Sequence, residues 1–186
     1  AKKLGRNTYC IFDDRQLQES SRRLGMENGL RMALAQKEFW LAYQPKVDLA
    51  SGRIMGVEAM LRWDSHQLGR ISPASFIPVA EESGLIIDIG DWVLHEAVAA
   101  ARRWRDTLGH EVPVAVNVAA AQFRSPRLLQ ALRAIAAEDR AMPRLIQLEV
   151  TESALISGLE DVTGKFIAIK EMGYHIAIDD FGTGYS

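Results

Sequence analysis

The sequence has very little cysteine, since Cys10 is the only one among its 186 residues. A single cysteine excludes an internal disulfide framework and any cysteine-rich zinc site. Long apolar runs are absent too, and none reaches the roughly 18 residues that a membrane-spanning helix needs. The first residues do not form a secretory signal, and Ala1 stands where an initiator Met would be. We therefore expect an excised piece of a longer protein.

The sequence also lacks a strong excess of charge of either sign. Its formal net charge is −2, so nothing indicates an electrostatic field that would attract nucleic acid. With 48% hydrophobic and 25% charged residues, the composition is that of an ordinary globular protein. The length suits one domain, or one domain and a fragment, with a sizeable core.

Apolar runs and helical periodicities alternate along the chain. Two apolar runs, 39–48 and 53–63, flank a turn at Ala50-Ser51-Gly52 and predict a hairpin. From residue 112 onward strands and helices alternate, which is typical of a parallel sheet with right-handed crossovers. The expected strands are 39–48, 53–63, 112–118, 145–150 and 174–178, and the expected helices are 13–37, 75–82, 85–108, 122–137 and 159–172.

The pattern fits both an open doubly wound sheet and a (β/α) barrel. A full barrel takes about 250 residues and eight strands, so five strands cannot close one. The fifth expected strand would then present an open edge, and an open edge invites pairing with a second copy of the chain.

Five polar residues follow largely apolar segments and are candidates for one shared site: Glu58, Asn117, Glu149, Asp179 and Asp180. The carboxyl ends of parallel strands meet at one rim, so these residues are expected to converge there. Four carboxylates and one amide oxygen suit Mg²⁺ or Mn²⁺ rather than zinc. A bound cation would also relieve the repulsion among the carboxylates.

The adjacent acids Asp179 and Asp180 indicate more than one metal ion. Neighbours within a strand face opposite ways, but at a strand end two successive carboxylates can serve two ions. Two metals about 3.5–4 Å apart can activate a water against a phosphodiester. Arg62 shares a strand face with Glu58, so it either forms a surface salt bridge with Glu58 or binds phosphate.

Simpler interpretations exist for single residues of this set. Asn117 could cap the helix that follows it, and His175 fits a strand core or rim better than a ligand position. Asp180-Phe181-Gly182 is similar to the magnesium motif of protein kinases. We reject that interpretation, because no Gly-rich phosphate loop or His-Arg-Asp loop precedes it.

At these residues the sequence resembles the EAL-domain family, the cyclic-di-GMP phosphodiesterases of bacterial signalling. The resemblance covers 38–186 and rests on motifs that occur in the family's order. They are Tyr43-Gln44-Pro45, Glu58-Ala59-Met60-Leu61-Arg62-Trp63, Phe76-Ile77-Pro78, Asn117-Val118, Leu148-Glu149-Val150-Thr151-Glu152-Ser153 and Asp179-Asp180-Phe181-Gly182-Thr183-Gly184-Tyr185-Ser186. Residues 1–12 look like the C-terminal tail of a GGDEF, or diguanylate cyclase-like, domain, which makes 13–37 a linker helix.

The resemblance implies an α/β fold: the N-terminal part of a modified TIM (β/α)8 barrel with an antiparallel first strand, about five of its eight strands being present. It implies a two-metal site of Mg²⁺ or Mn²⁺ and hydrolysis of cyclic-di-GMP to linear pGpG by a metal-activated water. A cytoplasmic domain is implied as well, in a parent that could be anchored in a membrane elsewhere. The implied metal ligands are Glu58, Asn117, Glu149, Asp179 and Asp180, the implied substrate contacts are Gln44, Met60, Leu61 and Arg62, and Glu152 is the implied loop anchor.

Two departures from the family pattern qualify this expectation. Met60 stands where the family usually has Leu, a nearly volume-conserving exchange that should cost little. The family's later Lys, a further metal-binding Asp, its general-base Glu and a Gln-Gly segment correspond to positions after Ser186. We therefore expect the 186 residues alone to be inactive. The alternative function is a receptor that binds cyclic-di-GMP without cleaving it.

Overall fold

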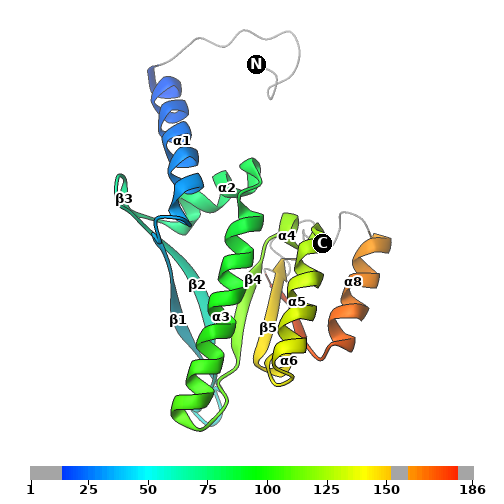
Figure 1. Ribbon diagram of the computed structural model, residues 1–186. Coiled ribbons are helices and arrows are strands. Elements are labelled where there is room, and N and C mark those ends of the chain that lie inside the picture. The colour runs from blue at the N-terminus through cyan, green and yellow to red at the C-terminus, as the bar shows by residue number, and fades with distance from the viewer. Residues whose placement is uncertain (1–13, 152–158, 180–186) are drawn as a thin grey trace.

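The structure is a computed structural model that describes residues 14–151 and 159–179, with α1 projecting away from the other elements (Figure 1). Within these ranges, helices and strands alternate for most of the chain. The helices are α1 (Asp14–Ala33), α2 (Pro73–Ser83), α3 (Ile86–Leu108), α4 (Ala120–Arg124), α5 (Pro126–Glu138), α6 (Met142–Leu145) and α8 (Leu159–Glu171). The strands are β1 (Phe39–Val47), β2 (Ile54–Ser65), β3 (Gly69–Ile71), β4 (Val114–Val118), β5 (Ile146–Thr151) and β6 (His175–Asp179).

The strands form one mixed sheet in the order β1-β2-β4-β5-β6, with β3 paired to β2. β1 is antiparallel to β2, whereas β2, β4, β5 and β6 run parallel. The expected hairpin, the antiparallel first strand and the parallel remainder are thus confirmed. In the described residues β6 pairs with β5 alone.

Three elements differ from the sequence-based expectation, and one of them is the short helix α6, which was not expected. β3 was not expected, because a strand of three residues carries no detectable alternation. The single helix expected over 122–137 is two helices, α4 and α5. The break lies at Pro126, which has no N–H to donate and favours extended backbone at Ser125 (φ −65°, ψ 139°). The Ser125 side chain then caps α5 by accepting from the N–H of Arg127.

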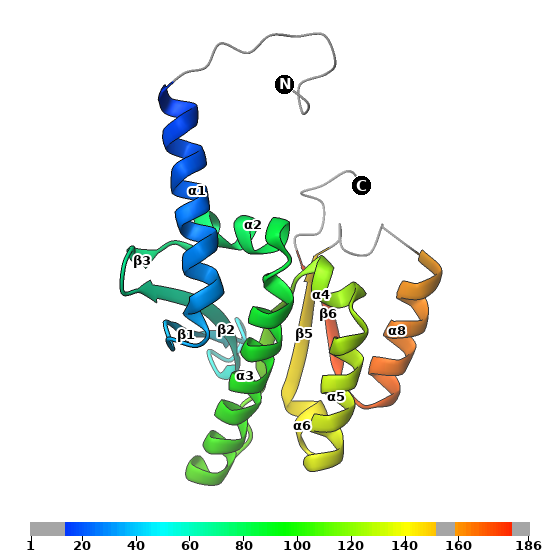
Figure 2. The same ribbon diagram turned by 45° about the horizontal axis from the view of Figure 1, so that its top comes forward.

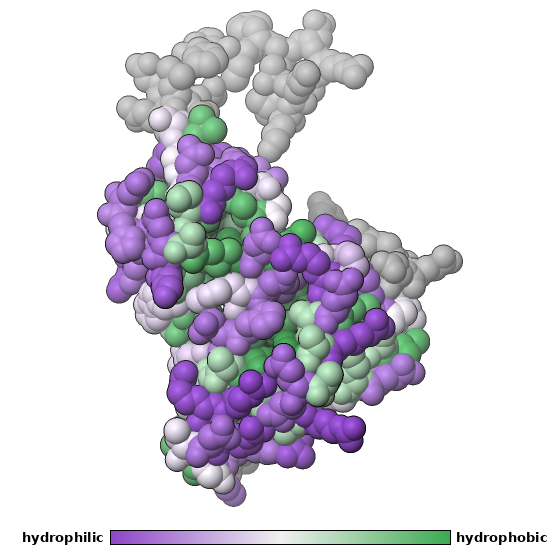
Figure 3. Space-filling view, viewed as in Figure 1, coloured by the Kyte–Doolittle hydropathy of each residue, from purple (hydrophilic) through white to green (hydrophobic). Residues whose placement is uncertain are grey.

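Helices α3, α5 and α8 lie along the same side of the sheet in both ribbon views (Figures 1 and 2). The strand residues that face them are apolar and buried. Val116 pairs in register with Leu148, and Leu148 pairs with Ile176. Val116 and Leu148 are 1% and 0% exposed, so their burial supplies much of the local stability. Hydrophilic residues cover much of the outer surface of these helices (Figure 3).

The C-terminal part of α1 packs on β2. Leu30 and Ala33 are buried, and a Cβ added at Gly29 would lie 3.1 Å from the indole of Trp63. Among the described residues, none of the helices combines the length and the apolar character needed to cross a bilayer.

Glu38 anchors the chain between α1 and β1. Its carboxylate accepts from the indole Nε1 of Trp63 and from the backbone N–H of His66, both at 2.9 Å. Burial by itself would raise the pKa of Glu38, but these hydrogen bonds and the nearby His66 ring hold the pKa below its ordinary value. Glu38 therefore stays ionised and ties α1 to the sheet.

Candidate functional site

The polar residues of the sheet lie on the face opposite α3, α5 and α8, which we call the open face. Side chains alternate along a strand, so the register that buries Val116 and Leu148 turns Asn117 and Glu149 to the open face. We define the open face by Gln44, Lys46, Glu58, Arg62, Asn117, Glu149 and Asp179.

Three of the predicted metal ligands lie next to one another on this face. Asn117 and Glu149 are register partners on β4 and β5. The Nδ2 of Asn117 donates to Oε1 of Glu58 at 2.8 Å. The sequence analysis placed Glu58 at a strand end, which is wrong, because β2 continues to Ser65. Glu58 reaches its neighbours across the sheet from the middle of β2.

Glu149 is the buried member of the group, with 8% of its surface exposed. Its carboxylate forms an ion pair with the ammonium group of Lys46, which lies on β1. An ionised carboxylate at this depth needs a partner of opposite charge or several donors. Lys46 supplies that partner here, and it occupies an oxygen that a metal ion would use.

Arg62 follows Glu58 on the same face of β2 but forms no ion pair within the described residues. Its guanidinium donates to the backbone oxygen of Leu61 at 2.9 Å and contacts the sulfur of Met60 at 3.6 Å. The predicted alternative of a Glu58–Arg62 salt bridge is therefore wrong. The planar fork of Arg62 keeps donors for an anion, and Met60 helps to hold it.

The other predicted residues are distributed as follows. Gln44 is exposed and is the register partner of Glu58. Leu61 alternates to the other face, where it packs against the hydrophobic core. Asp179 ends β6, is exposed and pairs in register with Thr151. His175 begins β6 and is exposed, which fits the rim position expected for it. Glu152 and Asp180 lie outside the described residues.

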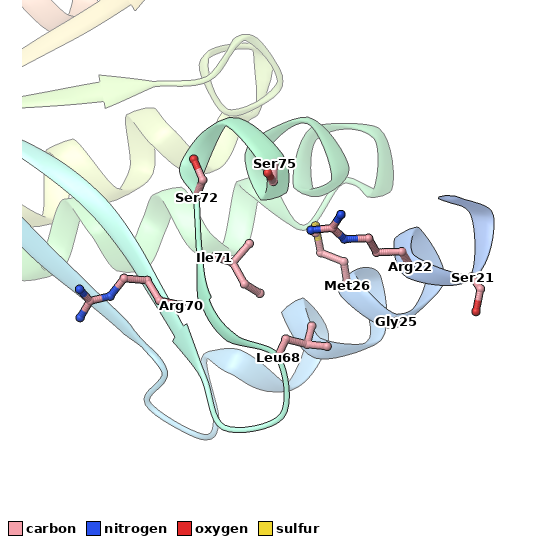
Figure 4. Close-up of a pocket in the computed structure, with 9 residues that line it drawn as sticks. All are labelled: Ser21, Arg22, Gly25, Met26, Leu68, Arg70, Ile71, Ser72 and Ser75. Carbon is pink, nitrogen blue, oxygen red and sulfur yellow. The ribbon is translucent and has the colours of Figure 1, made fainter. Parts of the chain in front are cut away.

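A cavity of about 390 Å³ joins this face to α2, α3 and α4. Glu58, Arg62 and Asn117 line it from the sheet. Apolar side chains line most of its helix side, together with Glu81 and Gln122. A larger hollow of about 630 Å³ lies between α1 and the β3–α2 segment, where Arg22 and Met26 approach Leu68 and Ile71 (Figure 4). No open-face residue lines that hollow, so it is separate from the site.

The donor chemistry of the open face fits a hard divalent cation. Glu58, Glu149 and the carbonyl oxygen of Asn117 are ligands of the kind that Mg²⁺ and Mn²⁺ prefer. In the described residues, however, no three Asp, Glu, His or Cys side chains are gathered closely enough to form a complete metal site.

Two side chains at this site were not singled out by the sequence analysis. Lys46 could have been found, because it lies two residues after Gln44 and so shares its strand face. Gln122, which is 2% exposed and lines the cavity, was treated only as part of a helix. The sequence feature that could have identified Gln122 is its polar side chain directly before the apolar Phe123.

Comparison with known sequences identifies a family and several relatives of this chain. The EAL domain family matches residues 27–186. The bifunctional diguanylate cyclase/cyclic di-GMP phosphodiesterase MucR of Pseudomonas aeruginosa is 40% identical over 189 residues, across 100% of this chain and 27% of its own length. The cyclic di-GMP phosphodiesterase PdeR of Escherichia coli K12 is 37% identical over 186 residues, across 100% of this chain and 28% of its own. The chain thus spans about a quarter of these relatives.

Solved structures show the same fold. The PaMucR phosphodiesterase in complex with c-di-GMP has a TM-score of 0.81 at 41% identity, covering 87% of this chain and 66% of that one. The FimX EAL domain of Xanthomonas citri in complex with c-diGMP has a TM-score of 0.74 at 26% identity, covering 90% and 64%. Since the family match takes in most of the residues and both relatives align along the whole chain, the chain belongs to the EAL domain family, whose structures are TIM-barrel-like.

Proposed function

We propose that the protein containing this chain hydrolyses cyclic-di-GMP to linear pGpG. The observation that carries the proposal is the contiguous set of oxygen donors at Glu58, Asn117 and Glu149, with Arg62 on the same face. Acids and an amide beside a free guanidinium suit a phosphodiester, because the arginine binds the phosphate while the acids hold cations. The two named relatives are themselves called cyclic di-GMP phosphodiesterases.

In this proposal the chain's own residues bind and orient the ligand. Arg62 takes a phosphate oxygen with its remaining N–H groups, and Gln44 contacts the dinucleotide from the neighbouring strand. Glu58, Asn117, Glu149 and Asp179 hold Mg²⁺ or Mn²⁺, and Asp180 contributes to a second site. A divalent metal held by these residues would activate a water and would stabilise negative charge at the phosphate. Lys46 has to leave Glu149 when the ion binds.

The finer organisation of the parent is part of the same proposal. Residues 1–12 are the tail of a GGDEF-like domain, 13–37 a linker helix and 38–186 an incomplete phosphodiesterase domain. The parent acts in signal transduction in the cytoplasm, with the GGDEF-like domain as its intramolecular partner and a homodimer as its assembly. Glu152 anchors the loop that begins at Asp180, and the general base belongs to a later segment. The 186 residues alone should bind cyclic-di-GMP without cleaving it.

The test is hydrolysis by the purified parent, with linear pGpG followed by anion-exchange chromatography. We expect turnover with Mg²⁺ or Mn²⁺ and none in EDTA. Glu58→Gln should lower turnover by at least about 100-fold, since even residues that only orient metal ligands contribute about 10- to 100-fold. Glu171→Gln, the same exchange at an exposed position of α8, should leave it unchanged.

The outcome also separates the two functions considered. Tight binding of cyclic-di-GMP with no metal-dependent turnover by the parent would establish the receptor function and exclude the hydrolase function. Failure to bind the dinucleotide at all would exclude both.

A further inference from the structure

Met60 supplies one of the two acceptors that hold the guanidinium group of Arg62. Arg62 donates from Nη1 to the backbone oxygen of Leu61 at 2.9 Å and from Nη2 to the sulfur of Met60 at 3.6 Å. Met60 and Arg62 alternate to the same face of β2, and both side chains line the cavity beside the site. Because Met60 is only half-buried there, its side chain is open to small solutes.

The two acids of β2 do not hold Arg62, although both alternate to its face of the strand. Glu58 accepts from the amide of Asn117 at 2.8 Å, and Asp64 accepts from the guanidinium of Arg70 at 2.9 Å. Arg62 is therefore oriented by a carbonyl group and a thioether, neither of which carries a charge.

The thioether of Met60 is well suited to orient an arginine that binds an anion. Sulfur is a weak acceptor, so it holds one N–H group of Arg62 without competing strongly with an anionic oxygen. The methionine side chain is flexible and polarisable, so it can remain in contact when the arginine moves toward a ligand. A leucine at this position would offer no acceptor, and it would have no atom that can be oxidised.

We propose that Met60 is a positioning residue for Arg62, and that oxidation of its sulfur weakens the binding of the phosphodiester by Arg62. This inference rests on the proposed function, because it takes the substrate from it. In the oxidation, hydrogen peroxide transfers one oxygen atom to the sulfur, the sulfur loses two electrons, and the peroxide leaves as water. The sulfoxide oxygen is a polar acceptor that binds the cationic guanidinium and competes for it with the phosphate of the substrate.

The experiment measures hydrolysis of cyclic-di-GMP by the purified parent before and after treatment with hydrogen peroxide. The protein is oxidised in EDTA, the peroxide is removed, and KM and kcat are measured with Mg²⁺ or Mn²⁺, while mass spectrometry measures the sulfoxide at Met60. KM should rise about tenfold, as for the loss of a hydrogen bond to a charged group. The kcat should change less, because Arg62 binds the phosphate alike in the ground state and the transition state. Methionine sulfoxide reductases should restore the original KM.

Variants of Met60 separate the effect of its sulfur from general oxidative damage. Met60→Gln places a permanent carbonyl acceptor beside Arg62, so it should raise KM as oxidation does, without peroxide. Met60→Leu removes the oxidisable atom, so its KM should not respond to peroxide. The matched controls lie at Met55, whose side chain is 62% exposed. Met55→Leu should keep the response to peroxide, and Met55→Gln should keep the original KM.

The possible results distinguish the role of Met60 from the proposed function. An unchanged KM in Met60→Gln or after full oxidation of Met60, a loss confined to kcat, or an equal response to peroxide in Met60→Leu would overturn the role of Met60. Each of these results would leave the proposed function standing. Absence of metal-dependent hydrolysis by the unaltered and untreated parent would overturn both.

Discussion

Glu38 and Glu149 are the two carboxylates that the described part of the chain buries, and they are stabilised in different ways. Glu38 accepts hydrogen bonds from an indole N–H and a backbone N–H, which are neutral and held by the fold, and the exposed ring of His66 also lies 2.9 Å from it. Glu149 faces the flexible ammonium group of Lys46, which comes from a strand 103 residues away in sequence. Glu38 lies beside α1, and Glu149 lies on the open face.

The difference separates an acid with a structural role from the acid that we propose as a metal ligand. Two neutral donors fixed in place bind Glu38 whether or not the exposed His66 ring also binds it. The Lys46 side chain can rotate away from Glu149, so Glu149 can exchange one cation for another without any change in the sheet. The predictions below test this contrast, beginning with the largest expected effect.

Removal of the Trp63 side chain should have the largest effect. Trp63 is fully buried, packs edge-on against Phe76 and donates to Glu38. Trp63→Ala should lower the free energy of unfolding by about 3–5 kcal/mol, as is usual for a buried aromatic residue. Urea denaturation followed by circular dichroism would measure it. The control is Trp40→Ala, because the Trp40 side chain is 40% exposed. An equal loss of unfolding free energy in both variants would contradict the structural role of the buried Trp63 and its bond to Glu38.

Neutralising Glu38 should have the next largest effect on the free energy of unfolding. In Glu38→Gln, one of the two acceptor oxygens becomes an NH₂ group that faces the donor of Trp63 or of His66. The expected loss is about 1–3 kcal/mol, the usual cost of leaving buried polar groups unpaired. The same denaturation experiment applies. An unchanged midpoint would show that Glu38 has no structural role.

The pH dependence of stability should reveal the same carboxylate. Since folding lowers the pKa of Glu38, its contribution is complete above the unfolded value of about 4.3 and is lost as pH falls through the lower, folded value. Between about pH 5 and pH 3 the unaltered chain should therefore lose stability more steeply than Glu38→Gln. Denaturation midpoints across this range would measure both slopes, and parallel slopes would exclude the assignment.

Neutralising Glu149 should have a smaller effect on stability. The amide in Glu149→Gln is uncharged and needs no cation, and Lys46 is exposed enough to return to solvent. We therefore expect the free energy of unfolding to change by about 1 kcal/mol or less. The ability of Mn²⁺ to raise the melting temperature should disappear. A melting curve with and without Mn²⁺ would measure both. If Mn²⁺ stabilised the variant as well as the unaltered protein, Glu149 would not be a ligand.

Lys46→Met should have the opposite effect on the metal response. Without the ammonium group, Glu149 has no competing cation, so Mn²⁺ should raise the melting temperature more than in the unaltered protein. Stability in EDTA should fall by about 1–3 kcal/mol, because the buried Glu149 carboxylate then has no charged partner. A weaker Mn²⁺ response in this variant would mean that Lys46 supports the site instead of competing for it.

Much of the fold was readable from local patterns. Alternation placed Glu58 and Arg62 on one face of β2, and the βα alternation predicted the parallel sheet. β3 was missed because three residues carry no periodicity. The break between α4 and α5 was signalled by Pro126 and overlooked. The pairing of Lys46 with Glu149 had no local signal, because it depends on strands distant in sequence.

By itself, the sequence determined which residue types lie on each face of each strand, since side-chain alternation is a property of the extended backbone. It also determined the all-oxygen character of the site through the residues that alternate to the open face. Only the tertiary structure decided which of these residues meet. Strand order and register bring Asn117 beside Glu149 and Glu58, and helix packing seats Gln122 on Gly90. Such contacts join segments far apart in the chain, so no local pattern contains them.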